Sequence, residues 1–204
     1  AYQRTLYLHS AHDLGHALQD LMLVGCSSLA VWGDKTEDGQ LLIGRNFDFY
    51  FSDDFATEKI VRGVRPEEGI PFMSYAWGGM LGVLSGLNLE GLTVTINAGK
   101  SSIPLKARTP ISLLCREILQ YAKNIDEAIA IAKKRKVFVS EAIMVGSAAD
   151  GKAVIIEVSP KKFGVYEAPN AVVCANHFQS EPYKTDKKNL KQINTSHSAY
   201  RYAK

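Results

Sequence analysis

The sequence has little cysteine, little excess charge and no long apolar run, and each shortage excludes a class of protein. Its three cysteines are too few and too scattered for a disulfide framework or a thiolate metal site, and an odd number leaves at least one thiol unpaired within the chain. The net charge of +3 is too small to indicate nucleic acid or an anionic membrane as a partner. No apolar run approaches the roughly 20 residues that a membrane-spanning helix needs. We therefore expect no nucleic-acid partner and no membrane span.

What the chain does have is the composition of one average globular domain. Its 204 residues are enough to bury a core, and its apolar and charged fractions of 46% and 22% are ordinary. The chain shows no signal peptide and begins at Ala1 without a methionine. Removal of an upstream segment would account for that start and favours a secreted or periplasmic protein, but the compartment stays undetermined.

The order of the hydrophobic patterns predicts an α+β fold with antiparallel sheets, because strand-like segments come first, two adjacent helices follow, and strands then resume. The first helix is expected after Thr109 as N-cap and the second near Asn124. Later strands are predicted at about 138–146, 152–158, 162–167 and 171–175.

One hairpin in the first half is especially clear. A strand is predicted from Met80 to Leu87, a turn follows, and residues 92–97 alternate between apolar and polar side chains. Asn97 therefore ends a strand on its polar face. Cys115 falls on the apolar stripe of the first helix, so it is interpreted as a packed core thiol.

A Gly-Cys bond separates residues 1–25, a lead segment with an apolar helical stripe, from a strand-like run that starts at Cys26. A thiol with an ordinary pKa of about 8.5 needs help to react at neutral pH. Cleavage of the bond would leave Cys26 with its own α-amine, which can act as the base. Gly25 favours this cleavage because it leaves its carbonyl open to attack. The alternative is a buried strand cysteine after a flexible glycine.

Charged and amide side chains stand where other strands end. Arg45 and Asp48 end the strand that is predicted to form a hairpin with the Cys26 strand. A positive charge on Arg45 would lower the pKa of the thiol, and Asp48 would orient the new ammonium. Asn97 and Asn176 also end strands, and each could donate a hydrogen bond to an oxyanion. The alternatives are a surface Arg/Asp pair and ordinary turn residues.

Two rival arrangements involve histidine. Four possible Zn²⁺ ligands share one face of a helix in the lead segment, namely His9, His12, Asp13 and His16. Gly15 weakens that helix, and four ligands on a single helix surround a metal poorly, so we predict no metal and no other cofactor. His177 or His197 could instead serve as the base for Cys26.

The order of these motifs resembles that of the N-terminal-nucleophile (Ntn) amidohydrolases of the choloylglycine hydrolase and penicillin acyltransferase superfamily, to which acid-ceramidase-type enzymes also belong. The family's Cys-Thr/Ser start resembles Cys26-Ser27-Ser28, and its Gly-Arg-Asn-x-Asp motif resembles Gly44-Arg45-Asn46-Phe47-Asp48. Its Asn-x-x-Gly-Leu turn, with a strand ending in Asn, resembles Asn88-Leu89-Glu90-Gly91-Leu92 with Asn97. Its later strand-end Asn resembles Cys174-Ala175-Asn176, and its Arg segment resembles Ala199-Tyr200-Arg201-Tyr202.

The resemblance implies a role for each of these residues. Cys26 would be the nucleophile and, through its amine, the base, while Arg45 and Asp48 hold and tune it. The oxyanion hole would comprise Asn97 and Asn176, and Arg201 would support the site. The implied fold is the four-layer αββα Ntn-hydrolase sandwich. It would be incomplete at its C-terminal end, because the family's domain continues well beyond the Arg segment.

The implied protein is an autoprocessing cysteine amidohydrolase or acyltransferase. The 25 residues before Cys26 favour the acyltransferase-like branch, in which a propeptide is removed, so residues 1–25 are predicted as propeptide and 26–204 as catalytic domain. The substrate would be a linear, non-peptide amide such as an N-acyl amino acid, amine or bile-salt-like conjugate. Side chains expected to bind it are Phe49, Tyr50, Trp77 and His177. A homo-oligomer is possible, and the alternative is an unprocessed, zymogen-like or non-catalytic ligand-binding domain.

Overall fold

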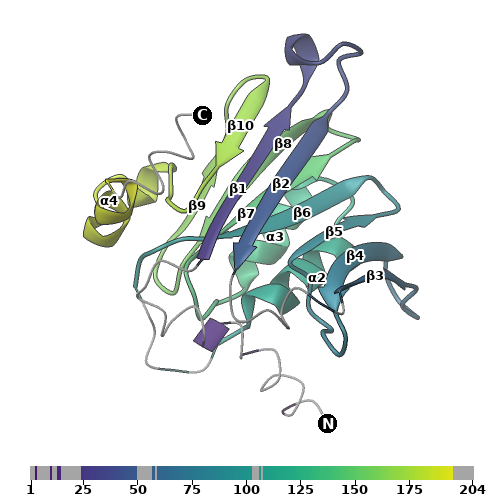
Figure 1. Cartoon of the computed structure of the whole chain (residues 1–204), viewed down its shortest axis with the longest axis horizontal. Helices are drawn as coiled ribbons and strands as arrows, with labels where there is room; N and C mark the ends of the chain where they lie inside the picture. Colours follow the sequence, from purple (N-terminus) through teal and green to yellow (C-terminus); the bar gives the residue numbers. More distant parts are fainter. Residues whose placement is uncertain are drawn as a thin grey trace.

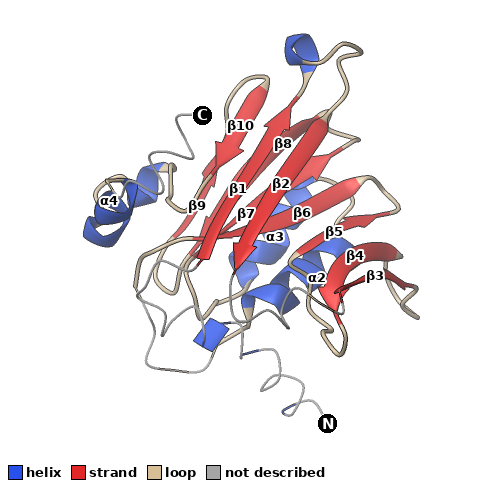
Figure 2. Ribbon diagram, in the orientation of Figure 1, coloured by secondary structure: helices blue, strands red, loops and turns tan. Residues whose placement is uncertain are grey.

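The computed structural model describes residues 24–49, 57, 59–102, 106 and 108–194, together with residues 3, 10, 13 and 14. Two β-sheets dominate these ranges, and every strand pair within them is antiparallel (Figures 1 and 2). This confirms the α+β class that the sequence predicts. Among the described residues, no helix is both long and apolar enough to cross a bilayer.

The smaller sheet has the strand order β10-β1-β2, and its strands are β1 (Val24–Val31), β2 (Leu42–Phe49) and β10 (Ala171–Cys174). The larger sheet runs from β3 to β9 in sequence order. Its strands are β3 (Lys59–Val64), β4 (Phe72–Trp77), β5 (Ser85–Asn88), β6 (Leu92–Ala98), β7 (Glu141–Ser147), β8 (Lys152–Val158) and β9 (Phe163–Tyr166). The helices are α2 (Ile111–Tyr121), α3 (Ile125–Lys134) and α4 (Lys187–Ile193), and short 3-10 turns cover Gly33–Lys35 and Glu181–Tyr183.

The described elements form stacked layers. Helices α2 and α3 pack on one face of the seven-stranded sheet, and the three-stranded sheet packs on its other face (Figure 1). One apolar core lies between the helices and the larger sheet and includes Leu114, Ile118 and Ile143. A second core lies between the two sheets and includes Met144 and Ile155. Helix α4 lies to the side of these layers, near β9 and β10 (Figure 1).

Strand alternation assigns side chains to these two cores as the sequence predicts for β6. Leu92, Val94 and Ile96 belong to the helix-side core, whereas Thr95 and Asn97 face the three-stranded sheet. The turn before β6 is held by Asn88, whose Oδ1 accepts hydrogen bonds from the N–H groups of Glu90 at 3.1 Å and Leu92 at 2.9 Å. Asn97 therefore ends β6 pointing between the sheets.

The strand predicted from Met80 is wrong over its first half, because β5 covers only Ser85–Asn88. The side chain of Arg62 donates hydrogen bonds to the carbonyl groups of Met80, Leu81 and Gly82. These carbonyls are therefore bound by a guanidinium group, and the apolar run forms a loop over Arg62.

The cap of α2 also differs from the prediction. The helix begins at Ile111, and Pro110, which precedes it, makes no side-chain capping hydrogen bond. The carboxylate of Asp13 accepts the N–H of Ile111 instead, at 3.1 and 3.4 Å, from 98 residues earlier in the chain. Asp13 is fully buried at this contact. A residue of the lead segment thus satisfies a backbone donor at the start of a core helix.

Candidate active site

Five strand ends meet at one end of the two sheets. β1 and β7 begin there, and β2, β6 and β10 end there, because neighbouring strands in each sheet are antiparallel. In the register of the smaller sheet, Cys26 lies opposite Phe47, and Ser28 lies opposite both Arg45 and Cys174. Residues paired in this way share a face, so these side chains all point toward the larger sheet. The sequence motifs are brought together by topology.

Cys26 lies at the centre of this cluster and is 1% exposed. Its backbone N–H donates to Oδ1 of Asn176 at 3.0 Å, and Nη2 of Arg45 donates to its Sγ at 3.8 Å. The thiol therefore has a cation beside it, and the backbone nitrogen of the same residue is bound by an amide oxygen. An Ntn mechanism would use both the thiol and the backbone nitrogen of Cys26, and each of these groups has a defined partner.

Arg45 is held in place on several sides. Its Nη1 donates to Oγ of Ser85 at 2.8 Å, and its Nη2 donates to the carbonyl of Ile96 at 2.5 Å. Its guanidinium carbon also lies 4.5 Å from the centre of the Phe47 ring. Burial lowers the pKa of Arg45, and the nearby Cys26 and Glu141 act to raise it. These contacts fix the charge near the Cys26 thiol.

The pKa of the Cys26 thiol is raised above its ordinary value, mainly because burial disfavours the thiolate. The charge of Arg45 acts to lower it, as the sequence predicts, and backbone hydrogen bonds from Asp48 and Ala98 act in the same direction. Glu141 adds to the rise. The expected effect of Arg45 is therefore present, but burial outweighs it, and the thiol stays protonated at neutral pH in the uncut chain.

Asn97 and Asn176 brace the ends of β6 and β10 against each other. Nδ2 of Asn97 donates to the carbonyl of Cys174 at 2.9 Å, and Nδ2 of Asn176 donates to the carbonyl of Ala98 at 2.9 Å. Each asparagine thus binds the backbone of the segment that carries the other. Each amide group retains a second Nδ2 hydrogen, which is the donor that an oxyanion would require.

Two residues that the sequence analysis missed orient Asn97. Oγ of Ser28 donates to Oδ1 of Asn97 at 2.9 Å and lies 3.3 Å from Oγ1 of Thr95. Ser28 is two residues after Cys26 on the same face of β1, so strand parity was the signal that could have placed it beside the site. Its hydroxyl fixes which end of the Asn97 amide is the oxygen.

Glu141 was missed as well. It begins β7, opposite Ala98, and is 1% exposed. Its charge acts to raise the pKa of Cys26, Arg45 and Cys115. Nothing in the sequence around Glu141 indicates a place near the site, because β7 reaches β6 only after both helices have intervened.

Asp48 lies beside the bond that is predicted to break, since its cross-strand partner is Gly25. Its carboxylate accepts a hydrogen bond from Nδ2 of Asn46 at 3.0 Å. It lies three positions after Arg45, so strand alternation places the two side chains on opposite faces of β2. Before any cleavage, Arg45 therefore faces the Cys26 thiol, and Asp48 lies opposite Gly25 on the neighbouring strand.

An aromatic pair lies next to Arg45. The rings of Phe47 and Trp77 are 6.0 Å apart, and Tyr75 lies 6.4 Å from Trp77. Phe47 and Trp77 are both half-buried against the helix-side core. They offer an apolar surface beside Cys26, because Phe47 lies opposite Cys26 in the strand register.

His177 directly follows Asn176 and is buried. Burial lowers its pKa, so it is neutral at pH 7. The remaining predicted residues lie outside the described side chains, namely Phe49, Tyr50, Arg201, His9, His12, His16 and His197. Within the part of the chain that the structure describes, no group of three or more His, Cys, Asp or Glu residues could hold a metal ion.

Residues 35–204 match the acyl-coenzyme A:6-aminopenicillanic acid acyl-transferase family. An uncharacterized protein of Archaeoglobus fulgidus is 29% identical over 160 residues, which are 73% of this chain and 26% of that protein. The chain thus spans about a quarter of the length of the curated relative that it matches.

Solved structures share the fold. The N-acylethanolamine-hydrolyzing acid amidase ortholog of Caenorhabditis elegans has a TM-score of 0.63 at 18% identity, over 88% of this chain and 86% of that one. Two variants of the conjugated bile acid hydrolase of Clostridium perfringens have TM-scores of 0.56 and 0.55 at 15% identity, over 83% of this chain and 57% and 58% of theirs. The family match and these shared folds together confirm the predicted Ntn-hydrolase family and fold.

Proposed function

The chain belongs to the acyl-coenzyme A:6-aminopenicillanic acid acyl-transferase family, and we propose that it is an autoprocessing cysteine amidohydrolase or acyltransferase. Its nucleophile would be Cys26, and its substrate a linear, non-peptide amide. The observation that carries the proposal is the pair of contacts at Cys26. Arg45 lies 3.8 Å from the thiol, and Asn176 lies 3.0 Å from the backbone nitrogen. A core cysteine would not need a guanidinium group beside its thiol.

The first reaction would cut the chain before Cys26. The thiolate of Cys26 attacks the carbonyl carbon of Gly25, the bond from that carbon to the Cys26 nitrogen breaks, and the nitrogen takes up a proton. Water then hydrolyses the resulting thioester, which yields a Gly25 carboxylate and a free thiol. The Cys26 α-amine that is released becomes the base for later turnovers. Asp48 is the cross-strand partner of Gly25, and its carboxylate would orient the new ammonium.

In each turnover the amine would take the thiol proton, and the thiolate would attack the amide carbonyl of the substrate. Asn97 and Asn176 would donate their second Nδ2 hydrogens to the oxyanion. The leaving amine takes the proton, and the acyl group stays on Cys26 as a thioester. Water or an acceptor amine then removes it. The first route is hydrolysis and the second is acyl transfer.

Intact-mass measurement of the purified chain tests the proposal. The wild type should yield two fragments, residues 1–25 and 26–204, whereas Cys26→Ala should stay whole. Cys115→Ala is the matched control, because this thiol is buried in the core away from β1 and should not affect cleavage. Addition of an N-acyl amide should then add the acyl mass to the fragment that begins with Cys26. A wild-type chain that remains whole and takes up no acyl group would exclude the proposal.

The apolar pair Phe47 and Trp77 supports an N-acyl substrate with an aliphatic acyl chain. Burial of one methylene contributes about 0.8 kcal/mol, which corresponds to roughly fourfold in kcat/KM. A series of N-acyl amides with increasing chain length should therefore show kcat/KM rising with each added methylene. Trp77→Ala should flatten this dependence, and equal kcat/KM for all chain lengths in the wild type would exclude the aliphatic class.

A second candidate is an unprocessed, ligand-binding member of the family. The observation that favours it is the burial of the Cys26 thiol, which raises its pKa. In that case the wild type stays whole in the mass measurement but still binds an N-acyl amide in calorimetry.

A further inference from the structure

Asn189, in helix α4, is fully buried, and both its amide oxygen and its amide nitrogen are hydrogen-bonded to the backbone that follows Asn176. Its Oδ1 accepts the N–H of Phe178 at 2.7 Å. Its Nδ2 donates to the carbonyl of Phe178 at 3.0 Å and to that of Tyr183 at 3.2 Å. A side chain bound to both polar groups of one residue fixes the peptide planes on each side of it. Phe178 is only two residues from Asn176.

The ring of Phe178 carries this constraint to the loop that follows Asn97. A Cβ atom built on Gly99 would lie 2.4 Å from the Phe178 ring, so the ring packs directly against the Gly99 backbone. The ring also contacts Tyr183, with centroids 4.2 Å apart. The loop that follows Asn97 and the loop that carries Asn176 therefore touch through Phe178, and a shift of this ring would affect both.

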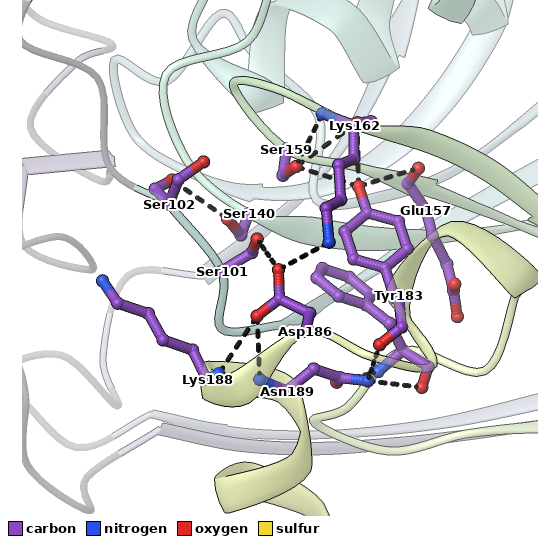
Figure 3. A network of polar contacts seen from close by, with 11 residues as sticks. Ser101, Ser102, Ser140, Glu157, Ser159, Lys162, Tyr183, Asp186, Lys188 and Asn189 are labelled. Carbon is purple, nitrogen blue, oxygen red and sulfur yellow. Dashed lines mark hydrogen bonds and ion pairs between the residues drawn. The ribbon is translucent and has the colours of Figure 1, made fainter.

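Asp186, the N-cap of α4, makes the second connection (Figure 3). Its Oδ2 accepts a hydrogen bond from Oγ of Ser101 at 2.8 Å and an ion pair from Nζ of Lys162 at 3.1 Å. Its Oδ1 accepts the N–H groups of Lys188 at 3.0 Å and Asn189 at 3.3 Å. Ser101 is four residues after Asn97. One carboxylate thus caps the helix that holds one loop and binds the other loop directly.

We propose that α4 acts as a clamp, formed by Asp186 and Asn189, that positions Asn97 and Asn176 beside Cys26. This inference rests on the proposed function, in which the two asparagines stabilise the oxyanion. Asp186 and Asn189 are positioning residues, because neither is among the contacts of Cys26. The clamp acts on the free Nδ2 hydrogens of the asparagines, whose direction depends on the backbone of residues 97–101 and 176–178. A displacement of about 1 Å at such a donor costs on the order of a hundredfold in rate.

Hydrogen exchange of the folded chain tests the clamp whether or not the wild type is active. Asn189→Ala should speed the exchange of the amides at 176–178 and 99–101 by about tenfold or more, because both loops lose an anchor. Ser101→Ala should do so at 99–101 alone. It removes one hydroxyl and leaves α4 intact, so it remains informative if Asn189→Ala does not fold. Lys191→Ala, on an exposed position of the same helix, is the matched control and should leave both loops unchanged.

Kinetics separate positioning from a purely structural role. The substrate is an N-decanoyl amide that releases 7-amino-4-methylcoumarin. Asn189→Ala and Ser101→Ala should each lower kcat by about tenfold to a hundredfold with KM nearly unchanged, since the hydrogen bonds to the oxyanion are made only in the transition state. Ser101→Thr keeps the hydroxyl and should restore kcat. Unchanged exchange in Asn189→Ala and Ser101→Ala would overturn the clamp. So would faster exchange in a variant whose kcat and rate of cleavage before Cys26 equal those of Lys191→Ala. A wild type that neither cuts itself nor hydrolyses the amide contradicts the proposed function instead, and exchange alone then decides whether the clamp exists.

Discussion

Burial and Arg45 act on the Cys26 thiol in opposite directions, and burial prevails in the uncut chain. The thiol is therefore protonated at neutral pH before cleavage, when no α-amine is available to deprotonate it. Arg45 limits the rise in pKa, and its contacts to Ser85 and Ile96 keep it from turning away. The first cut should accordingly be slow near neutral pH and become faster as the pH rises toward the raised thiol pKa.

Arg45→Gln should move this pH profile to higher pH. Removal of the charge removes an influence that lowers the thiol pKa, so less thiolate is present at any given pH. The rate of cleavage before Cys26 in freshly translated chain, measured between pH 7 and 10 on a denaturing gel, should fall most at the low end. Arg135→Gln removes the same charge from an exposed ion pair with Glu117 and serves as the control. A profile that coincides with that of the wild type would contradict the role of Arg45.

At the residue scale, the sequence predicted the side chains whose positions are readable from strand ends. Asn97 and Asn176 lie near or just beyond strand ends, whereas Arg45 lies within β2 and does not end it. The structure brings all three to Cys26 or its immediate neighbours. Ser28, Ser85 and Glu141 were missed because their importance depends on which strands become neighbours across the two sheets. That information lies in long-range packing, and no local pattern of the sequence contains it.

Among the elements, β7 shows how closely the two sheets approach. A Cβ atom on Gly146 would lie 2.2 Å from Cδ1 of Ile43 and 2.8 Å from Oγ1 of Thr93. Gly146→Ala should therefore push β2 away from β6 and β7, at a cost of about 1–3 kcal/mol in the free energy of unfolding. Urea unfolding measures this cost. Gly63→Ala in β3, where nothing lies within 4 Å of the added atom, should change the unfolding free energy far less, and equal effects would refute the packing argument.

The elements also show where local patterns suffice. The alternation of residues 92–97 predicted both faces of β6, and the apolar stripes predicted α2 and α3. The strand from Met80 was wrong because Arg62, on a different strand, binds the carbonyls of that segment. The cap of α2 was wrong because Asp13 supplies it from far away in the sequence. In both cases a distant side chain replaced the local interaction on which the prediction was based.

For the molecule as a whole, His177 should make stability depend on pH. Burial lowers its pKa in the folded state below the ordinary 6.5, so the unfolded chain binds a proton first as the pH falls. The contribution of neutral His177 to the free energy of unfolding is fully present above pH 6.5. It declines below that pH, by at most about 1.4 kcal/mol per pH unit for one proton. Urea unfolding at pH 7.5 and 5.5 should show a smaller decline for His177→Gln than for the wild type. Identical declines would assign the effect to other groups.

The whole fold was predicted more fully than its connections. The α+β class, the antiparallel sheets and the Ntn-hydrolase family follow from the order of elements and motifs and are confirmed. The division into a three-stranded and a seven-stranded sheet, with β10 returning to pair with β1, was not predicted. The pairing of β1 with β10 joins residues about 145 positions apart, such as Ser28 and Cys174. Such long-range strand pairings depend on the packing energy of the complete fold and not on a local sequence pattern.

The contact between Asp13 and Ile111 acquires a different meaning if the chain is cut before Cys26. While the chain is intact, donor and acceptor belong to one molecule, and their encounter does not depend on protein concentration. After the cut the same hydrogen bond would join two separate polypeptides, so dilution would weaken it by mass action. The start of α2 would then lose a cap worth about 0.5–2 kcal/mol whenever the shorter polypeptide departs. An irreversible chemical step would thereby give one core helix a concentration-dependent stability.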